Sequence, residues 1–152
     1  MLDLVTVGET MVAFTPATPG FLRYVQQFGK VTAGAESNVA IGMAKLGHSS
    51  GWISKLGKDE FGEFVLRELR GEGVDTSRVV RSETNPTGIM FKQFNPGGES
   101  SVFYYRKNSA ASTLCPADID EEYLTQARVV HVSGVTAALS PSCAETLRHM
   151  VA

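Results

Sequence analysis

The sequence is poor in several features that would assign it to a particular class of protein. It has only two cysteines, Cys115 and Cys143, and neither lies in a CxxC motif or at ligand spacing from a histidine. We therefore expect both thiols to be reduced and structural, which argues against a disulfide framework or a metal site. The sequence also lacks any block of like charges, and its net charge is −2. This balance argues against a nucleic-acid surface or a polybasic membrane anchor.

Long apolar runs are missing as well. The first ten residues, MLDLVTVGET, place Asp3 and Glu9 where a signal peptide would need its basic and apolar regions. No later segment is long enough to cross a bilayer. We therefore expect a cytoplasmic protein, and the 43% hydrophobic content is enough for a single domain with its own core.

The segments that are present alternate between strand and helix patterns. The run LVTVGE lacks strict apolar/polar alternation, which predicts a strand buried on both faces. Further along the chain we predict a helix over 36–46, a strand over 51–57, a helix that begins after Asp59 as its N-cap, a buried strand within 127–134 and a helix from Ser140. This order predicts a parallel α/β sheet, which binds ligands beyond the carboxyl ends of its strands.

Two stretches do not fit this alternation. The first, about 11–33, contains Pro16, Pro19 and Gly20. The second, 87–106, contains the turn sequence NPGGES between two strand-like runs, which predicts a hairpin. We expect both stretches to form antiparallel strands outside the main sheet. They would serve either as a lid over the site or as an edge that pairs with another subunit.

The second stretch leads into VFYYRKNSAAS, residues 102–112. Side chains alternate across a strand, so Tyr104 and Arg106 are predicted to share one face while Tyr105 lies on the other. A guanidinium fork beside a phenol suits a ligand with a carboxylate and hydroxyl groups. The same residues also fit a solvated strand end in which Arg106 stacks on Tyr104, and the strand alone does not decide between these interpretations.

A second candidate site lies at the start of the first predicted helix. Free backbone N–H groups at a helix start can bind oxygen-rich ligands, and a glycine there allows close approach. Asn38 favours helices poorly, so its amide is expected to have a partner. The alternative is that these residues only cap the helix. The candidate residues are Gly34, Ala35, Glu36, Ser37 and Asn38.

Taken together, these motifs resemble a known family. AGAESNVAIGMAKLGHSSGWISKLGKDEFG, residues 33–62, resembles the first signature of the PfkB (ribokinase-like) carbohydrate kinases. Four further segments resemble one branch of this family, the 2-keto-3-deoxygluconate kinases. They are the GET after the first strand, the TGIMF of the hairpin, FYYRKNSAAS and VVHVSGVTAALSP. The resemblance covers essentially the whole chain. It implies a ribokinase-like three-layer α/β/α fold with a small antiparallel β lid.

The resemblance also implies where the substrate binds. A sugar acid would be held by the run Gly34 to Asn38 and by the YYR strand, with Arg106 binding the carboxylate. Met90 aligns with a hairpin aromatic that touches substrate in relatives, but a thioether cannot replace a tyrosine hydroxyl. The lid resembles a sheet that often pairs between subunits, so a homo-oligomer is also expected. The substrate-binding residues implied are Gly34, Ala35, Glu36, Ser37, Asn38, Met90, Tyr104, Tyr105 and Arg106.

One part of the family pattern is absent. The GAGD motif, whose Asp takes the proton from the sugar hydroxyl, does not occur in these 152 residues. We therefore expect residues 1–152 to be the amino-terminal part of a truncated kinase domain, without a catalytic residue or metal ligand and without turnover alone. ATP and Mg²⁺ would be needed by the intact enzyme. Two alternatives stay open: a kinase of a neutral sugar such as fructose or ribose, and a catalytically silent sugar-binding or dimerisation fragment.

Overall fold

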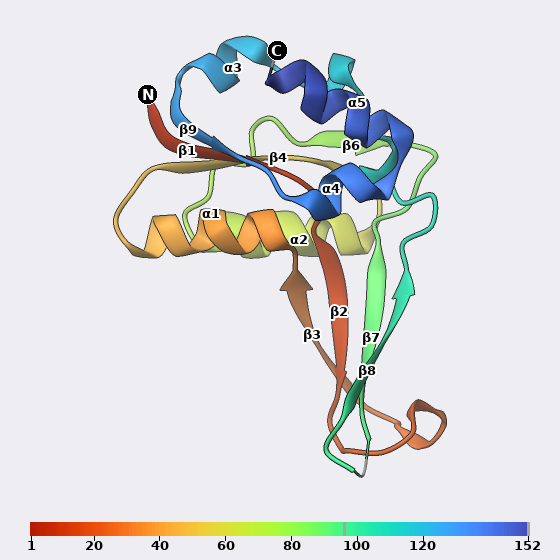
Figure 1. Ribbon diagram of the computed structural model, residues 1–152. Coiled ribbons are helices and arrows are strands. Elements are labelled where there is room, and N and C mark those ends of the chain that lie inside the picture. The colour runs from red at the N-terminus through yellow and green to blue at the C-terminus, as the bar shows by residue number, and fades with distance from the viewer. Residues whose placement is uncertain (96, 152) are drawn as a thin grey trace.

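A central parallel sheet separates two layers of helices in the computed structural model, which describes residues 1–95 and 97–151 (Figure 1). The sheet has the order β4 (Ser50–Ile53), β1 (Leu2–Val7), β9 (Ala127–His131). Helices α1 (Ala35–Lys45) and α2 (Glu60–Gly71) lie on one side of it. On the other side lie α3 (Glu121–Thr125) and α5 (Pro141–Met150), while α4 (Gly134–Leu139) follows the carboxyl end of β9. The predicted α/β/α layering is confirmed.

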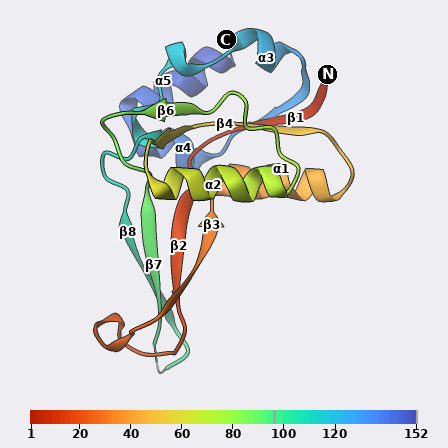
Figure 2. The same cartoon turned by 180° about the vertical axis from the view of Figure 1, so that it is seen from behind.

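A second sheet, which we call the projecting sheet, extends away from these layers (Figures 1 and 2). Its order is β3 (Phe28–Ala33), β2 (Met11–Pro16), β7 (Ile89–Phe94), β8 (Ser100–Tyr105). The expected antiparallel strands are present, but the sheet is mixed, because β2 and β7 leave the main layers in the same direction and pair in parallel. The β2–β3 and β7–β8 pairs are antiparallel.

The remaining elements are short. Strands β5 (Lys55–Gly57) and β6 (Val80–Ser82) form a separate parallel pair. Three single turns of 3₁₀ helix, η1 (Leu22–Tyr24), η2 (Ala111–Thr113) and η3 (Pro116–Asp118), lie between longer elements. None of the helices in the described ranges combines the length and the apolar character needed to cross a membrane.

Local sequence signals set several element ends where they were predicted. Gly47 has φ +86° after α1, a conformation that glycine adopts without strain. Asp59 caps α2 by accepting the Gly62 N–H at 2.8 Å. The β7–β8 hairpin is also confirmed, with the Asn95 N–H donating to the Glu99 carbonyl at 2.8 Å. Pro96 of that turn lies outside the described residues.

Apolar side chains fill both sides of the central sheet. The cluster beneath α1 and α2 includes Ala40, Trp52 and Leu69, each 0% exposed. The cluster on the other side includes Val5 and the free thiol Cys143. Two buried layers around one sheet fix the carboxyl end of β1, where the site described below begins.

Strand β9 is less buried than its sequence predicted. Val129 is 56% exposed and Val130 is 43% exposed, although both are strongly apolar. The reason is its position: β9 pairs with β1 along one edge, and within the described ranges no strand pairs along the other. The expectation of a strand buried on both faces is therefore correct for β1 and wrong for β9 here.

Candidate substrate site

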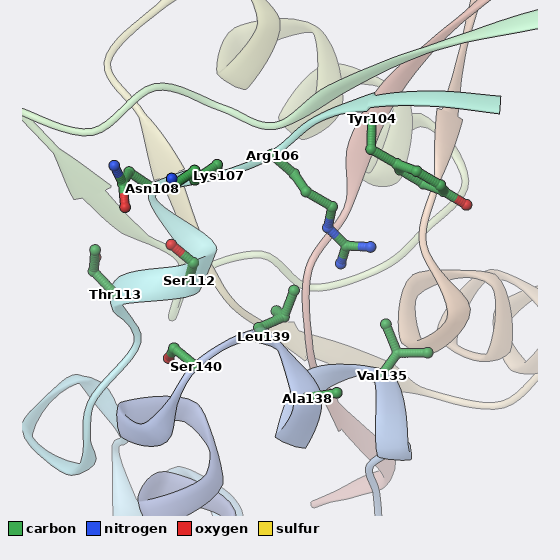
Figure 3. Close-up of a pocket in the computed structure, with 10 residues that line it drawn as sticks. All are labelled: Tyr104, Arg106, Lys107, Asn108, Ser112, Thr113, Val135, Ala138, Leu139 and Ser140. Carbon is green, nitrogen blue, oxygen red and sulfur yellow. The ribbon is translucent and has the colours of Figure 1, made fainter.

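A cavity of about 690 Å³ lies between the end of β8 and the α4–α5 segment (Figure 3). Arg106 and Lys107 give it two cationic side chains. Hydroxyl groups come from η2 and from the N-cap of α5, and α4 supplies an apolar wall. The hydroxyl-bearing residues are Ser112, Thr113 and Ser140, and the apolar ones are Val135, Ala138 and Leu139. The volume lies within the usual range for small-molecule sites, and the lining suits a polar anion with one apolar side.

Arg106 is the side chain that reaches furthest toward the apolar wall. Figure 3 shows it extending from the end of β8 toward Leu139 and Val135, with the Tyr104 ring beside it. The predicted shared face of Tyr104 and Arg106 is present, and the Arg106 Cζ lies 5.6 Å from the centroid of the Tyr104 ring. The Arg106 side chain is only 24% exposed, so it is not a freely solvated strand end.

A buried carboxylate holds Arg106 in this position. The Glu9 Oε2 atom lies 2.5 Å from the Arg106 Nη2 atom, and the Glu9 side chain is 1% exposed. The Ser109 hydroxyl donates to the Glu9 Oε1 atom at 2.5 Å. Glu9 was not among the residues selected from the sequence. Its signal is an acidic residue directly beyond a buried parallel strand, the edge at which such sheets bind ligands.

The start of α1, which the sequence predicted as a second candidate site, adjoins the cavity through Glu9. Gly34 is the N-cap of α1, and a Cβ there would lie 2.6 Å from the Glu9 carbonyl oxygen and from the Thr10 and Ser37 hydroxyls. Only glycine allows this close packing of α1 against the end of β1. The run Gly34 to Asn38 does not itself line the cavity.

Glu36 is directed away from solvent. It is 1% exposed, and its carboxylate accepts hydrogen bonds from the Ser133 hydroxyl at 2.6 Å and the Thr136 hydroxyl at 2.7 Å. Ser37 is also buried, and its hydroxyl donates to the Gly34 carbonyl at 3.2 Å. In this arrangement Glu36 ties α1 to α4, and only its backbone is available for a ligand contact. Ala35 and Asn38 are exposed.

Met90 and Tyr105, the other two residues of the sequence-predicted set, do not line the cavity either. Met90 is 7% exposed and packs with Met11 and Ala13 in the projecting sheet. Tyr105 lies on the opposite face of β8 from Arg106, edge-on to the Phe91 ring with centroids 5.9 Å apart. Of the nine predicted residues, Tyr104 and Arg106 are therefore the two that border the cavity.

Comparison with known proteins identifies the family. The family model described as "pfkB family carbohydrate kinase" matches residues 1–152. The chain belongs to the pfkB family of carbohydrate kinases. Among relatives in this family, a 2-dehydro-3-deoxygluconokinase of Bacillus subtilis (strain 168) is 48% identical over 151 residues, covering 99% of this chain and 47% of the relative. A 5-dehydro-2-deoxygluconokinase of Clostridium beijerinckii is 36% identical over 143 residues, covering 93% and 42%.

Solved structures agree with this assignment. The crystal structure of a PfkB protein from Polaromonas sp. JS666 matches with a TM-score of 0.94 and 43% identity. The match covers 99% of this chain and 51% of that one. This pfkB-family chain therefore spans about half the length of the relatives that it matches.

Proposed function

We propose that this chain supplies the substrate pocket and lid of a cytoplasmic kinase that transfers the γ-phosphate of ATP to 2-keto-3-deoxygluconate. The observation that carries the proposal is Arg106, which a buried carboxylate holds at a cavity of sugar size. The name of the Bacillus subtilis relative, a 2-dehydro-3-deoxygluconokinase, supports the same substrate. The projecting sheet is proposed as the lid, and its exposed aromatic residues are proposed to pair between subunits.

Each part of the proposed substrate has a chemical counterpart in the cavity. The guanidinium of Arg106 can bind the carboxylate through two parallel N–H groups, beside the hydroxyl of Tyr104. Ser112, Thr113 and Ser140 offer hydroxyls to the sugar alcohol groups. The apolar α4 wall suits the methylene of a deoxy sugar acid, which a fully hydroxylated sugar lacks. The helix mouth at Gly34 is proposed as a further, backbone contact.

The chemistry of phosphate transfer is proposed for the intact enzyme, where bound ATP and Mg²⁺ supply the phosphoryl group and balance its charge. Among residues 1–95 and 97–151, no group of three or more His, Cys, Asp or Glu side chains is placed to hold a metal ion. We therefore assign none of them to Mg²⁺. Asp59 does not suit the role of general base, because its two oxygens accept the Gly62 and Thr87 N–H groups. The described residues bind and orient the acid.

Calorimetric titration of the 152-residue chain with 2-keto-3-deoxygluconate tests this proposal. We expect binding that falls by about tenfold or more in Arg106→Ala, because a charge-assisted bidentate contact is lost. Arg128→Ala is the matched control, since Arg128 is a 71% exposed arginine that pairs with Asp3. It should leave the affinity unchanged. A coupled phosphorylation assay should show no turnover.

The competing substrates are tested in the same titration. D-Fructose represents the neutral-sugar kinases, and binding tighter than that of the sugar acid would overturn the choice of substrate. The name of the Clostridium beijerinckii relative makes 5-dehydro-2-deoxygluconate the second acid to compare. If none of these ligands gives heat, the result would favour a fragment that does not bind sugars when it is on its own.

A further inference from the structure

Glu9 is the buried carboxylate that holds Arg106 at the cavity. It follows β1 by two residues, and its side chain is 1% exposed. A carboxylate in the interior is costly unless it is paired and hydrogen-bonded. Its partners are therefore the first guide to what it does.

One of those partners, Arg106, belongs to the charged wall of the cavity, which Arg106 and Lys107 form. One carboxylate oxygen is paired with the Arg106 guanidinium, and the other accepts the Ser109 hydroxyl. Ser109 is itself 1% exposed and the Glu9 side chain is 1% exposed, so the hydrogen bond between them is shielded from water. Glu9 is paired with the Nη2 atom of Arg106. Figure 3 shows the guanidinium of Arg106 directed toward Leu139 and Val135 on the opposite wall of the cavity.

This arrangement also sets the charge that a ligand meets. Arg106 and Lys107 bring two positive charges to the cavity, and the adjacent Glu9 offsets one of them. A second negative charge on a ligand would then find no full counter-charge and would be repelled by Glu9 at low local dielectric.

We propose that Glu9 is a positioning residue for Arg106 that also makes the cavity select ligands with one negative charge over ligands with two. The proposal deepens the proposed function, since it concerns which acids the same cavity accepts. Glu9 acts through Arg106 and needs no contact with the ligand.

A pair of sugar acids measures the charge selection. D-Gluconate carries one carboxylate and D-glucarate carries two, on chains of the same length. In Glu9→Gln, the side chain keeps its shape and can still accept from Arg106, but the negative charge is gone. We expect the ratio of glucarate to gluconate affinity, measured by calorimetry, to rise by about threefold to tenfold.

Two control variants separate this role from a structural one. Ser109→Ala removes the hydrogen bond that Glu9 accepts from the Ser109 hydroxyl and keeps the charge of Glu9. Glu36→Gln neutralises another buried glutamate whose partners are hydroxyls. Both should leave the ratio within about twofold of the unmutated chain. An equal rise in Glu36→Gln would overturn the proposal, because the effect would then be general to any lost charge. An unchanged ratio in Glu9→Gln would also overturn it.

A measurement without ligand tests the positioning role and is independent of the proposed function. In ¹⁵N NMR of arginine side chains, Arg106 should give resolved, slowly exchanging guanidinium signals, assigned by their loss in Arg106→Lys. Glu9→Ala should make them exchange rapidly. If the unmutated chain binds neither acid, the charge selection is overturned, whereas the proposed function is decided separately by the titration with 2-keto-3-deoxygluconate and the positioning role of Glu9 by the NMR result. Signals that are unchanged in Glu9→Ala would end the proposal.

Discussion

The two walls of the cavity are anchored by two buried glutamates with opposite chemistry. Glu36 accepts hydrogen bonds from two neutral hydroxyls, those of Ser133 and Thr136, and joins α1 to α4. Glu9 is equally hidden, yet it holds a cation whose other side faces the cavity. Equal burial therefore does not mean equal roles. The neutral wall, formed by α4, is fixed by the hydrogen bonds of Glu36. The charged wall, formed by Arg106 and Lys107, can respond to an anion.

We expect the neutral wall to contribute more to the stability of the fold than the charged wall. Glu36→Ala leaves an empty space at a 1% exposed position and deprives two hydroxyls of their acceptor. We expect a loss of about 3–5 kcal/mol in the free energy of unfolding, measured by urea denaturation. Glu9→Ala should cost about 2 kcal/mol, because the partly exposed Arg106 side chain can be hydrated instead. A larger cost for Glu9→Ala would contradict the expectation that the neutral wall contributes more to stability than the charged wall.

A glycine beside Glu36 offers a second way to break the neutral wall. A Cβ at Gly8 would overlap the Cδ and Oε2 atoms of Glu36. Gly8→Ala should therefore cost about 1–3 kcal/mol in the unmutated background through overpacking. In the Glu36→Ala background the overlap is removed, so the added cost should fall below about 1 kcal/mol. Additive losses in the double variant would show that Gly8 is required for another reason.

The junction between α1 and the charged wall can be tested at Gly34. A Cβ at this position meets the Glu9 carbonyl oxygen at 2.6 Å, and a backbone atom cannot move aside as a side chain can. Gly34→Ala should cost about 2 kcal/mol and weaken sugar-acid binding, since it displaces Glu9. Gly42→Ala in the same helix meets nothing within 4 Å, and should instead stabilise the chain by about 0.5–1 kcal/mol. Similar effects in both variants would contradict the proposed close contact.

The sequence predicted what depends on local pattern and failed where distant segments meet. The glycine at the end of α1, the cap of α2 and the shared face of Tyr104 and Arg106 follow from the backbone preferences of a few neighbouring residues. The Ser109–Glu9 and Thr136–Glu36 contacts each join residues 100 positions apart. No periodicity reports such a contact, so Glu9 was missed and Glu36 was assigned to the ligand. The burial of β9 failed for the same reason, because it depends on which strand lies beside it.

A third carboxylate, that of Asp59, differs from Glu9 and Glu36 because it is only partly buried. Asp59 joins the start of α2 to the base of the projecting sheet by accepting the Gly62 and Thr87 N–H groups, each at 2.8 Å. Burial raises the pKa of Asp59, but these hydrogen bonds outweigh it and hold the pKa below its ordinary value of 3.8. The folded state therefore binds fewer protons than the unfolded state. The stabilisation is present above about pH 4 and is lost as the pH falls through the lower folded pKa.

Asp59→Asn tests this pH dependence with the smallest expected effect. Asn can still cap α2, but it has one acceptor oxygen for two N–H groups. We expect a loss of about 1 kcal/mol at pH 7, measured by urea denaturation, and a smaller loss at pH 3, where the native carboxylate is itself being protonated. A loss that is the same at both pH values would mean that the charge of Asp59 does not contribute. Its role would then be like that of Glu36, a matter of hydrogen-bond geometry alone.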